Sequence, residues 1–257
     1  MLEMSGLRKV YNPGTVRELC LFENFSLSIP GGQFLSIVGS NGSGKSSLMN
    51  LICGTIRPDA GQIAVDGQDI TKMPEHRRLK RIGRIHQNPA MGTCANISIL
   101  ENLALADNKV RRMNLMPGVD RKRKERYREM LRPLGLGLEN MLDARAGSLS
   151  GGQRQALAMV MCVMTPIDFL ILDEHTAALD PKTSDLIMEL TDKAVRENGL
   201  TALMVTHNLR YAIQYGDRLL MLHQGGIVLD KAGKEKEATR LEDVLDLFTQ
   251  ISIELGN

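Results

Sequence analysis

Short apolar runs recur along the chain, and each is bounded by glycine or by polar residues. The runs read QFLSIV (33–38), DFLILD (168–173), TALMVT (201–206) and RLLMLH (218–223). Apolar and polar positions hardly alternate within them, which is typical of strands buried on both faces of a parallel sheet. Longer helical patterns lie between the runs, and one of them, residues 183–199, ends at a glycine. Because predicted strands and helices alternate, the sequence indicates an α/β fold.

The middle of the chain has a different pattern. From about residue 88 to 165 it is helical, and it includes the basic run RKRKERYREMLRPLGLG at 121–137. We therefore predict a single domain over 1–257, in which a helical sub-domain (about 88–165) is inserted into an α/β body (about 1–87 and 166–230). Residues 231–257 are predicted to form a short helical tail. The basic residues of this run, from about Arg121 to Arg128, form either a solvated helix face or a surface that meets anionic lipid or the cytoplasmic loops of a membrane partner.

Composition narrows the function only slightly. The chain has 257 residues, 43% of them hydrophobic, and a formal net charge of +2. This balance predicts neither a nucleic-acid partner nor a membrane-surface partner. The four cysteines lack the spacing of metal ligands and are expected to be reduced thiols. The longest apolar stretch, ALAMVMCVM (156–164), is much shorter than the roughly 20 residues of a membrane-spanning helix. It predicts a buried helix in a chain that does not itself cross a membrane.

A phosphate-binding loop is predicted at GSNGSGKSS, residues 39–47. It fits the pattern G-x-x-x-x-G-K-[ST] and lies between a predicted strand and a helix predicted at about 45–53. Glycines let such a loop turn its N–H groups inward, and the helix N-terminus adds a positive dipole. A Gly/Ser-rich turn that happens to carry a lysine is the alternative, which the strand–loop–helix context disfavours. The candidate nucleoside-triphosphate ligands are Gly39, Ser40, Asn41, Gly42, Ser43, Gly44, Lys45, Ser46 and Ser47; Lys45 would reach the β- and γ-phosphates and Ser46 would bind Mg²⁺.

Polar side chains follow two of the predicted strands. Asp173 ends the strand at 168–173, where ligands bind in open α/β sheets, and it is a candidate Mg²⁺ ligand. Glu174 comes next and is the candidate general base for the attacking water. Solvated acids at a strand end are the alternative for both. His207 follows the strand at 201–206 and is either a capping residue or a contact of the γ-phosphate.

The ordered motifs together resemble the ATPase subunit of an ATP-binding cassette (ABC) transporter. They are the phosphate loop, Gln87, LSGGQ at 149–153, Asp173–Glu174, Ala178–Asp180 and His207. The resemblance covers residues from about 2 to 230. It implies a P-loop NTPase core with a mainly parallel sheet, an N-terminal antiparallel β part and an inserted α-helical sub-domain. It also implies ATP hydrolysis with Mg²⁺.

The resemblance assigns the LSGGQ motif to a second copy of the chain. In this family the motif lies at a helix N-terminus and binds the γ-phosphate held by the opposite subunit of a head-to-tail dimer. The adjacent glycines would then lower the stability of the helix but allow close approach to that phosphate. The residues that would bind ATP in trans are Ser150, Gly151, Gly152, Gln153 and Asp180.

The remaining roles also follow from the resemblance. Tyr11 would stack on adenine with Val16 beside it, although an exposed strand-end aromatic is the alternative for Tyr11. Gln87 would join Mg²⁺ and water to the helical sub-domain, and His207 would be the switch histidine. The implied catalytic residues are Glu174, His207, Lys45 and Gln87, and the implied Mg²⁺ ligands are Ser46, Gln87 and Asp173.

Two departures from the family pattern stand out. His175 occupies the position where the family usually has proline. A titrating histidine could make activity depend on pH, but a tolerated local substitution is favoured because the following TAALD is retained. The helix after LSGGQRQ reads ALAMVMCVM, where many relatives have arginines, which suggests a more apolar seat for this helix.

The favoured function is the energy-coupling ATPase of a multi-subunit bacterial importer. Separate permease subunits would dock on Gln87 and the segment after it, at the cytoplasmic face of the membrane, and an extracytoplasmic solute-binding protein would complete the system. No nucleic-acid partner is expected. The alternatives are a soluble ABC ATPase of translation, repair or cluster assembly, and a P-loop kinase or GTPase, against which LSGGQ and AALD argue. Phrases such as NPGTVRELCLFEN and MPEHRR resemble ATPases of import systems, some of them for amino acids, aromatic ones included.

Overall fold

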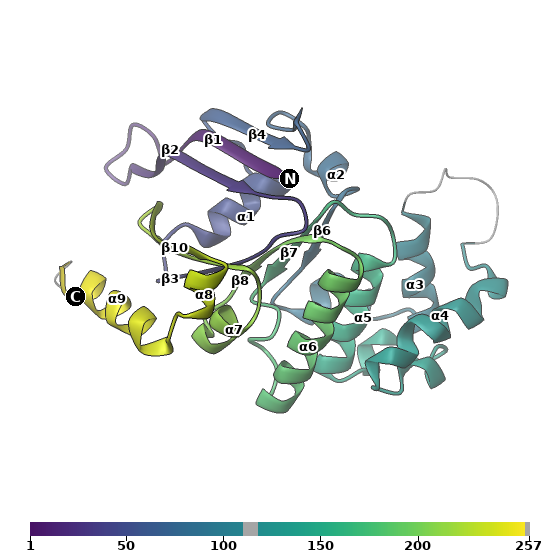
Figure 1. Ribbon diagram of the computed structural model, residues 1–257. Helices are drawn as coiled ribbons and strands as arrows, with labels where there is room; N and C mark the ends of the chain where they lie inside the picture. The colour runs from purple at the N-terminus through teal and green to yellow at the C-terminus, as the bar shows by residue number, and fades with distance from the viewer. Residues whose placement is uncertain (110–117, 255–257) are drawn as a thin grey trace.

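The central sheet positions the ends of the predicted strands side by side (Figure 1). The computed structural model describes residues 1–109 and 118–254. The strand order is β10-β9-β3-β8-β7-β6, and neighbours run parallel except for β9 and β10. The bounds are β3 (Phe34–Gly39), β6 (Ile82–Ile85), β7 (Phe169–Asp173), β8 (Thr201–Val205), β9 (Arg218–His223) and β10 (Gly226–Ala232). The four apolar runs correspond to β3, β7, β8 and β9, and the predicted α/β fold is confirmed.

A second sheet is antiparallel and formed largely by the N-terminal part of the chain. It consists of β1 (Leu2–Tyr11), β2 (Leu19–Ile29), β4 (Ala60–Val65) and β5 (Gln68–Asp69) in the order β2-β1-β4-β5. Helix α1 (Lys45–Cys53) lies between the two sheets (Figure 1), and its Leu48 and Ile52 are fully buried in the core that they share. Packing on both sides fixes α1, and with it the loop that precedes it.

The C-terminal end of α1 is held by a buried arginine. Helix α2 (Glu75–Arg78) carries Arg78, whose side chain is almost completely buried. Its Nη1 donates hydrogen bonds to the carbonyl oxygens of Leu51 (2.7 Å) and Ile52 (3.0 Å). These carbonyls belong to the last turn of α1 and have no partner within the helix, so the guanidinium both satisfies them and complements the helix dipole.

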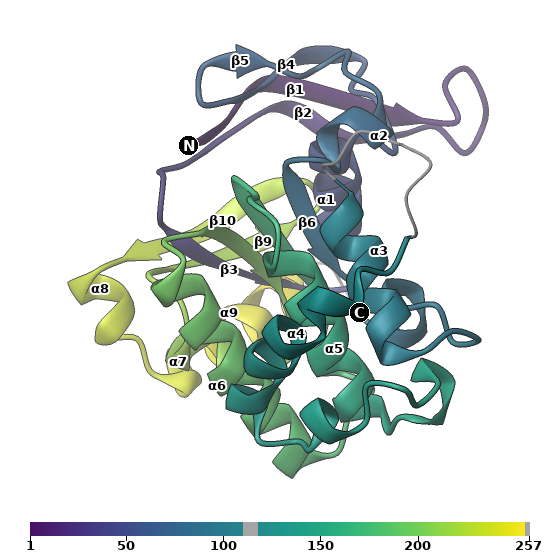
Figure 2. The same cartoon turned by 90° about the vertical axis from the view of Figure 1, so that its right-hand side faces the viewer.

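The inserted region is built from α3 (Ile99–Asn108), α4 (Lys124–Leu131) and α5 (Gly151–Val163), joined by short 3₁₀ helices. Figure 2 views the molecule from the side of these helices. The apolar stretch within α5 is buried: Ala156, Leu157, Met159 and Val160 belong to the largest core cluster. The prediction of a buried helix there is confirmed. Among residues 1–109 and 118–254, no helix is both long and apolar enough to cross a membrane.

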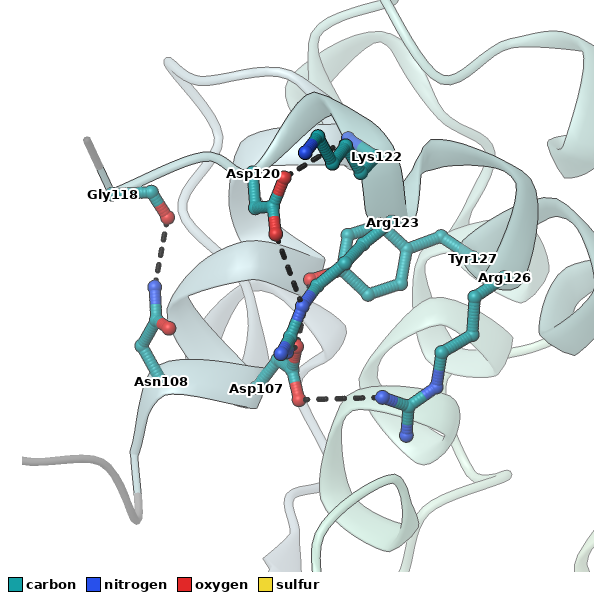
Figure 3. Close-up of polar contacts among 8 residues, drawn as sticks. All are labelled: Asp107, Asn108, Gly118, Asp120, Lys122, Arg123, Arg126 and Tyr127. Carbon is teal, nitrogen blue, oxygen red and sulfur yellow. Dashed lines mark hydrogen bonds and ion pairs between the residues drawn. The ribbon is translucent and has the colours of Figure 1, made fainter. Parts of the chain in front are cut away.

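Several basic side chains of the basic run form ion pairs with nearby acids. Asp107, almost buried at the end of α3, pairs with Arg123 and accepts a hydrogen bond from the Tyr127 hydroxyl at 3.0 Å (Figure 3). Lys124 pairs with Asp143, and Arg128 pairs with Glu125 on its own helix. The Asp107 contacts link α3 to α4, and the ion pairs balance the charges of Arg123, Lys124 and Arg128, which favours the solvated helix face over a lipid-binding surface for these residues.

The remaining helices cover the central sheet and form the C-terminal tail. They are α6 (Pro181–Glu197), α7 (Leu209–Gln214), α8 (Lys234–Glu237) and α9 (Leu241–Glu254). Strand β10 continues to Ala232, and two helices follow it where one short helix was expected. Helices α5 and α6 lie side by side (Figures 1 and 2). Their N-termini are adjacent, because Gly151 lies next to Leu179 and Gly152 next to Thr183, so the exposed Ser150, Gly151 and Asp180 lie near one another.

Candidate active site

The loop between β3 and α1 has the backbone of an anion-binding site. Gly42 (φ 79°) and Gly44 (φ 106°) adopt left-handed conformations that favour glycine. Gly44 is the N-cap of α1, and no side chain caps this helix end. The first N–H groups of α1 are therefore available to a bound anion, and the helix dipole favours negative charge at the same place.

Lys45 is held inside this loop. Its side chain is buried, and Nζ donates hydrogen bonds to the carbonyl oxygens of Gly39 (2.7 Å) and Ser40 (2.9 Å). Burial lowers the pKa of Lys45, while the negative charge of Glu174 opposes this shift. Neutral carbonyl acceptors thus hold the ammonium group inside the loop. A phosphate oxygen bound there would displace them, because charge-assisted hydrogen bonds are stronger.

Glu174 and His207 meet across the ends of β7 and β8. Glu174 Oε1 lies 2.8 Å from His207 Nε2. The backbone of Glu174 is left-handed (φ 46°), and its N–H donates to the carbonyl oxygen of Val205 at 2.9 Å. A non-glycine residue in this conformation is strained, and such strain is concentrated at functional sites. The strained turn directs the Glu174 carboxylate toward His207.

A cavity of about 250 Å³ joins the phosphate loop to this pair. Residues 41–47, Glu174 and His207 line it, together with three apolar or aromatic side chains. Tyr11 lies at one wall, where its hydroxyl is 2.9 Å from Ser47 Oγ. Val16 is fully exposed and does not line the cavity. The structure therefore brings most of the predicted cis-binding residues together in this cavity, whereas Val16, Gly39 and Ser40 do not line it.

Leu19 and Leu21 line the same cavity and were not among the sequence candidates. Leu19 is the direct cross-strand partner of Tyr11 in the β1–β2 pair. Since facing residues of an antiparallel pair lie close together, the register of this hairpin would have identified Leu19. The sequence alone does not give that register, because bulges interrupt the pairing.

The three proposed Mg²⁺ ligands come from three elements. Ser46 is exposed in the first turn of α1, Gln87 is exposed just beyond the end of β6, and Asp173 ends β7. A hydroxyl, an amide and a carboxylate are hard oxygen ligands of the type that Mg²⁺ takes together with phosphate oxygens. The donor chemistry and the loop beside it thus fit a magnesium–nucleotide complex. Asp173 and Gln87 do not line the 250 Å³ cavity, and Asp173 is paired with Arg84 at 2.7 Å.

The LSGGQ motif forms the N-terminus of α5. Ser150 is the N-cap: its Oγ accepts from Gln153 N–H (3.2 Å), and Gln153 Oε1 accepts from Ser150 N–H (3.1 Å). Asp180 caps α6 in a similar way, through Thr183 N–H (3.1 Å), and hydrogen bonds from Thr183 lower its pKa. These residues lie outside the phosphate-loop cavity of their own chain. Their predicted contact with ATP therefore requires an ATP molecule bound by a second copy of the chain.

The two glycines of the motif have different surroundings. Gly151 is exposed, whereas Gly152 is buried against α6. A Cβ at Gly152 would lie 2.1 Å from Thr183 Cγ2, a clash that requires movement, whereas a Cβ at Gly151 would lie 3.2 Å from Leu179 Cδ2. Close packing between α5 and α6 therefore accounts for Gly152 within a single chain, and Gly151 is the glycine whose exposed backbone suits an external anion.

His175 is buried and neutral. Its Nε2 lies 3.2 Å from the hydroxyl oxygen of Thr191 on α6. Burial lowers the pKa of His175 to about 4. The histidine is therefore uncharged near pH 7, which agrees with a tolerated substitution.

Because of this burial, His175 should make the protein sensitive to acid. In the unfolded chain the imidazole titrates near its usual 6.5, so the unfolded state binds more protons between pH 6.5 and about 4. The contribution of neutral His175 to the free energy of unfolding is fully present above pH 6.5, and it is lost as the pH falls from 6.5 toward about 4. We expect urea unfolding to show that wild type loses up to about 3 kcal/mol more than His175→Gln between pH 7 and pH 4. A difference between the two proteins that does not change with pH would contradict this assignment.

The comparisons with known proteins agree on one family. The model of the family described as ABC transporter matches residues 22–177. The chain is 46% identical over 248 residues to a tyrosine transport ATP-binding protein of Clostridioides difficile (strain R20291), with 96% of this chain and 98% of that protein covered. It is 32% identical over 235 residues to a phosphonates import ATP-binding protein of Alcaligenes faecalis, with 90% and 82% covered.

A solved structure with the same fold is a dimeric ATP-binding cassette in a post-hydrolysis state, bound to ADP and Pi. Its TM-score is 0.75 at 29% sequence identity, and the match covers 90% of this chain and 98% of that one. The fold is thus that of a P-loop NTPase cassette, as predicted.

Proposed function

Because this chain belongs to the ABC transporter family of ATPases, we propose that it is the energy-coupling subunit of a multi-subunit importer. ATP hydrolysis coupled to transport follows from the family. The finer proposal is that two copies enclose two ATP molecules head to tail and move separate permease subunits at the cytoplasmic face of the membrane. An extracytoplasmic solute-binding protein would deliver the solute.

The observation that carries the catalytic part is the shared cavity of the phosphate loop and the Glu174–His207 pair. Lys45 and the uncapped N-terminus of α1 would bind the phosphates, and Tyr11 would contact the base. Mg²⁺ held by Ser46, Gln87 and Asp173 would neutralise charge on the β- and γ-phosphates. Glu174 would accept a proton from the attacking water, and His207 would orient the Glu174 carboxylate and donate to the γ-phosphate.

The trans part of the proposal draws on the exposed N-terminus of α5. Ser150 and Gly151 are exposed, and the first turn of a helix attracts anions. The solved relative bound to ADP and Pi is dimeric. Together these support a second copy whose phosphate approaches Ser150, Gly151, Gly152 and Gln153 in the sandwich, with Asp180 linking the two sites.

A surface next to Gln87 is the proposed docking site for a permease. A cavity of about 330 Å³ lies there between β6, α3 and α5, with apolar walls that include Ala106, Ala158 and Met161. The side chains of Met91 (67% exposed) and Leu105 (56% exposed) lie at neighbouring positions. Gln155 Nε2 on α5 donates to His86 O at 3.2 Å, so the LSGGQ helix is bonded to the residue before Gln87. Exposed apolar side chains beside such a cavity suit an apolar segment of a partner.

A charge placed on this surface should weaken permease binding. We expect Met91→Glu to reduce the amount of permease that co-purifies with the tagged chain, because a carboxylate would be desolvated on docking. ATP binding by the isolated chain should be unchanged. Val228→Glu, at an apolar residue exposed on β10, is the matched control. Unaltered co-purification of Met91→Glu would place docking elsewhere.

For the solute, we propose an amino acid, with tyrosine as the first to test. The support is the similarity to a tyrosine transport ATP-binding protein over 96% of the chain. The test is uptake of labelled tyrosine by cells that lack the gene, complemented with wild type or with Glu174→Gln. Uptake restored by wild type alone supports import of this solute. Unchanged uptake in the deletion strain, together with normal ATPase activity of the protein, would favour another solute or a soluble role.

A further inference from the structure

Arg84 lies where the elements that carry the proposed Mg²⁺ ligands meet. It is on β6, and its side chain points toward the end of β7 and the middle of α1. Arg84 Nη2 donates to Asp173 Oδ2 at 2.7 Å. Arg84 Nη1 donates to Asn50 Oδ1 at 3.0 Å. One guanidinium group thus bonds two side chains that are far apart in the sequence.

The three elements joined in this way carry two of the proposed ligands and lie next to the third. Ser46 lies in the first turn of α1, the helix that carries Asn50. Asp173 accepts from Arg84 directly, and Gln87 follows just beyond the end of β6. Ser46 is on α1, Asp173 is on β7, and Gln87 follows β6. The spacing of these three side chains therefore depends on how α1, β6 and β7 are held together at this end of the sheet.

The geometry of the contact favours arginine in particular. The side chains of Arg84 and Asp173 are 16% and 20% exposed, so the pair is largely shielded from water. Arg84 Nε is buried without a hydrogen-bond partner among the described residues. A shielded pair of this kind is poor evidence for a gain in stability, because desolvation offsets the attraction. A planar fork, however, can direct two hydrogen bonds at once, which a lysine ammonium cannot do in the same fixed geometry.

We propose that Arg84 is a positioning residue for magnesium: it holds the Asp173 carboxylate through Oδ2 and ties β7 to α1, so that the oxygen ligands keep the spacing that the metal needs. This inference rests on the proposed function, since it assumes that Asp173 and Ser46 bind Mg²⁺. Arg84 acts through Asp173 and Asn50 and touches neither nucleotide nor metal. Partners that orient metal ligands in this way control metal affinity.

The test measures how much Mg²⁺ strengthens nucleotide binding. The affinity of the purified chain for the non-hydrolysable analogue AMP-PNP is measured by calorimetry, in excess Mg²⁺ and in EDTA. We expect Arg84→Met and Arg84→Lys each to lower the ratio of the two affinities about 10-fold, as is typical when an outer partner of a metal ligand is lost. The affinity in EDTA should stay at the wild-type value, because the phosphate loop is unchanged.

Arg81→Met is the matched control. Arg81 precedes β6 and pairs with Asp168, which precedes β7, so this variant removes an Arg–Asp pair between the opposite ends of the same two strands. Its affinity ratio should equal that of wild type. Should Arg84→Met not fold, Asn50→Ala leaves every charge in place and must still lower the ratio.

The possible outcomes separate this inference from the proposed function. A wild-type ratio in Arg84→Lys and Asn50→Ala would overturn the positioning role. A higher ratio in Arg84→Met would overturn it too, because it would mean that the arginine charge only competes with the metal. If wild type itself bound AMP-PNP equally well with and without Mg²⁺, the magnesium site of the proposed function would fail as well.

Discussion

Replacement of Glu174 by glutamine is expected to slow ATP hydrolysis by about 10²- to 10⁴-fold, the usual contribution of a general base. Glutamine has nearly the same shape and can still contact His207, but its amide cannot accept a proton from water. The phosphate loop is untouched, so ATP affinity should be retained. Phosphate release at saturating Mg²⁺ and ATP measures the rate, and nucleotide titration measures the affinity.

The unhydrolysed nucleotide should also make the dimer visible. Light scattering of Glu174→Gln with Mg²⁺ and ATP should show a shift from monomer to dimer that wild type shows only transiently. Glu197→Gln, at an exposed glutamate of α6 that pairs with Lys193, is the matched control and should behave like wild type. Wild-type turnover by Glu174→Gln would refute the general-base assignment. A loss of ATP affinity would instead mean that Glu174 supports the shape of the loop.

The elements that hold the phosphate loop could be predicted from the sequence because their signals are local. Helix α1 begins and ends where predicted, at Lys45 and Cys53, since Gly44 and Gly54 adopt left-handed conformations at its two ends. The strand before it is a continuous apolar run that is buried throughout in the central sheet. Such signals depend on neighbouring residues alone, so a single sequence contains them.

Contacts between distant segments could not be predicted in this way. The Arg84–Asp173 pair joins residues 89 positions apart, and Leu19 reaches the cavity through its pairing with Tyr11. Gly152 is required by the methyl group of Thr183 on a different helix. Each of these depends on which elements are neighbours in space, which the pattern of apolar residues leaves open.

Val16 and His175 show the same limit at single residues. Val16 lies in a connection between two strands that carries no apolar pattern, and it is fully exposed. The replacement of proline by His175 was visible in the sequence, but its consequence depends on burial. The histidine is buried beside Thr191 of α6, whose hydroxyl provides its hydrogen bond, and this burial keeps it uncharged near pH 7.

Replacement of Ser150 by aspartate should abolish the ATP-dependent dimer without harming the fold. Aspartate caps helices as well as serine does, and the dipole of α5 favours its charge. In the sandwich, however, the carboxylate would face the γ-phosphate held by the other copy. Two unit charges about 4 Å apart near a protein surface repel by about 4 kcal/mol. We therefore expect ATPase activity to fall by at least about 100-fold and the dimer of the Glu174→Gln background to disappear.

The neutral variant Ser150→Asn separates charge from size. Asparagine is also a good N-cap and has almost the same volume as aspartate, so it should retain much more of the dimer and of the activity. Equal losses in both variants would mean that the space at Ser150, rather than its charge, limits the approach of the second copy. If Ser150→Asp dimerised with ATP as its parent does, α5 would not contact the ATP held by the second copy. Packing against Thr183 would then remain as the reason for a glycine, and it applies only to position 152.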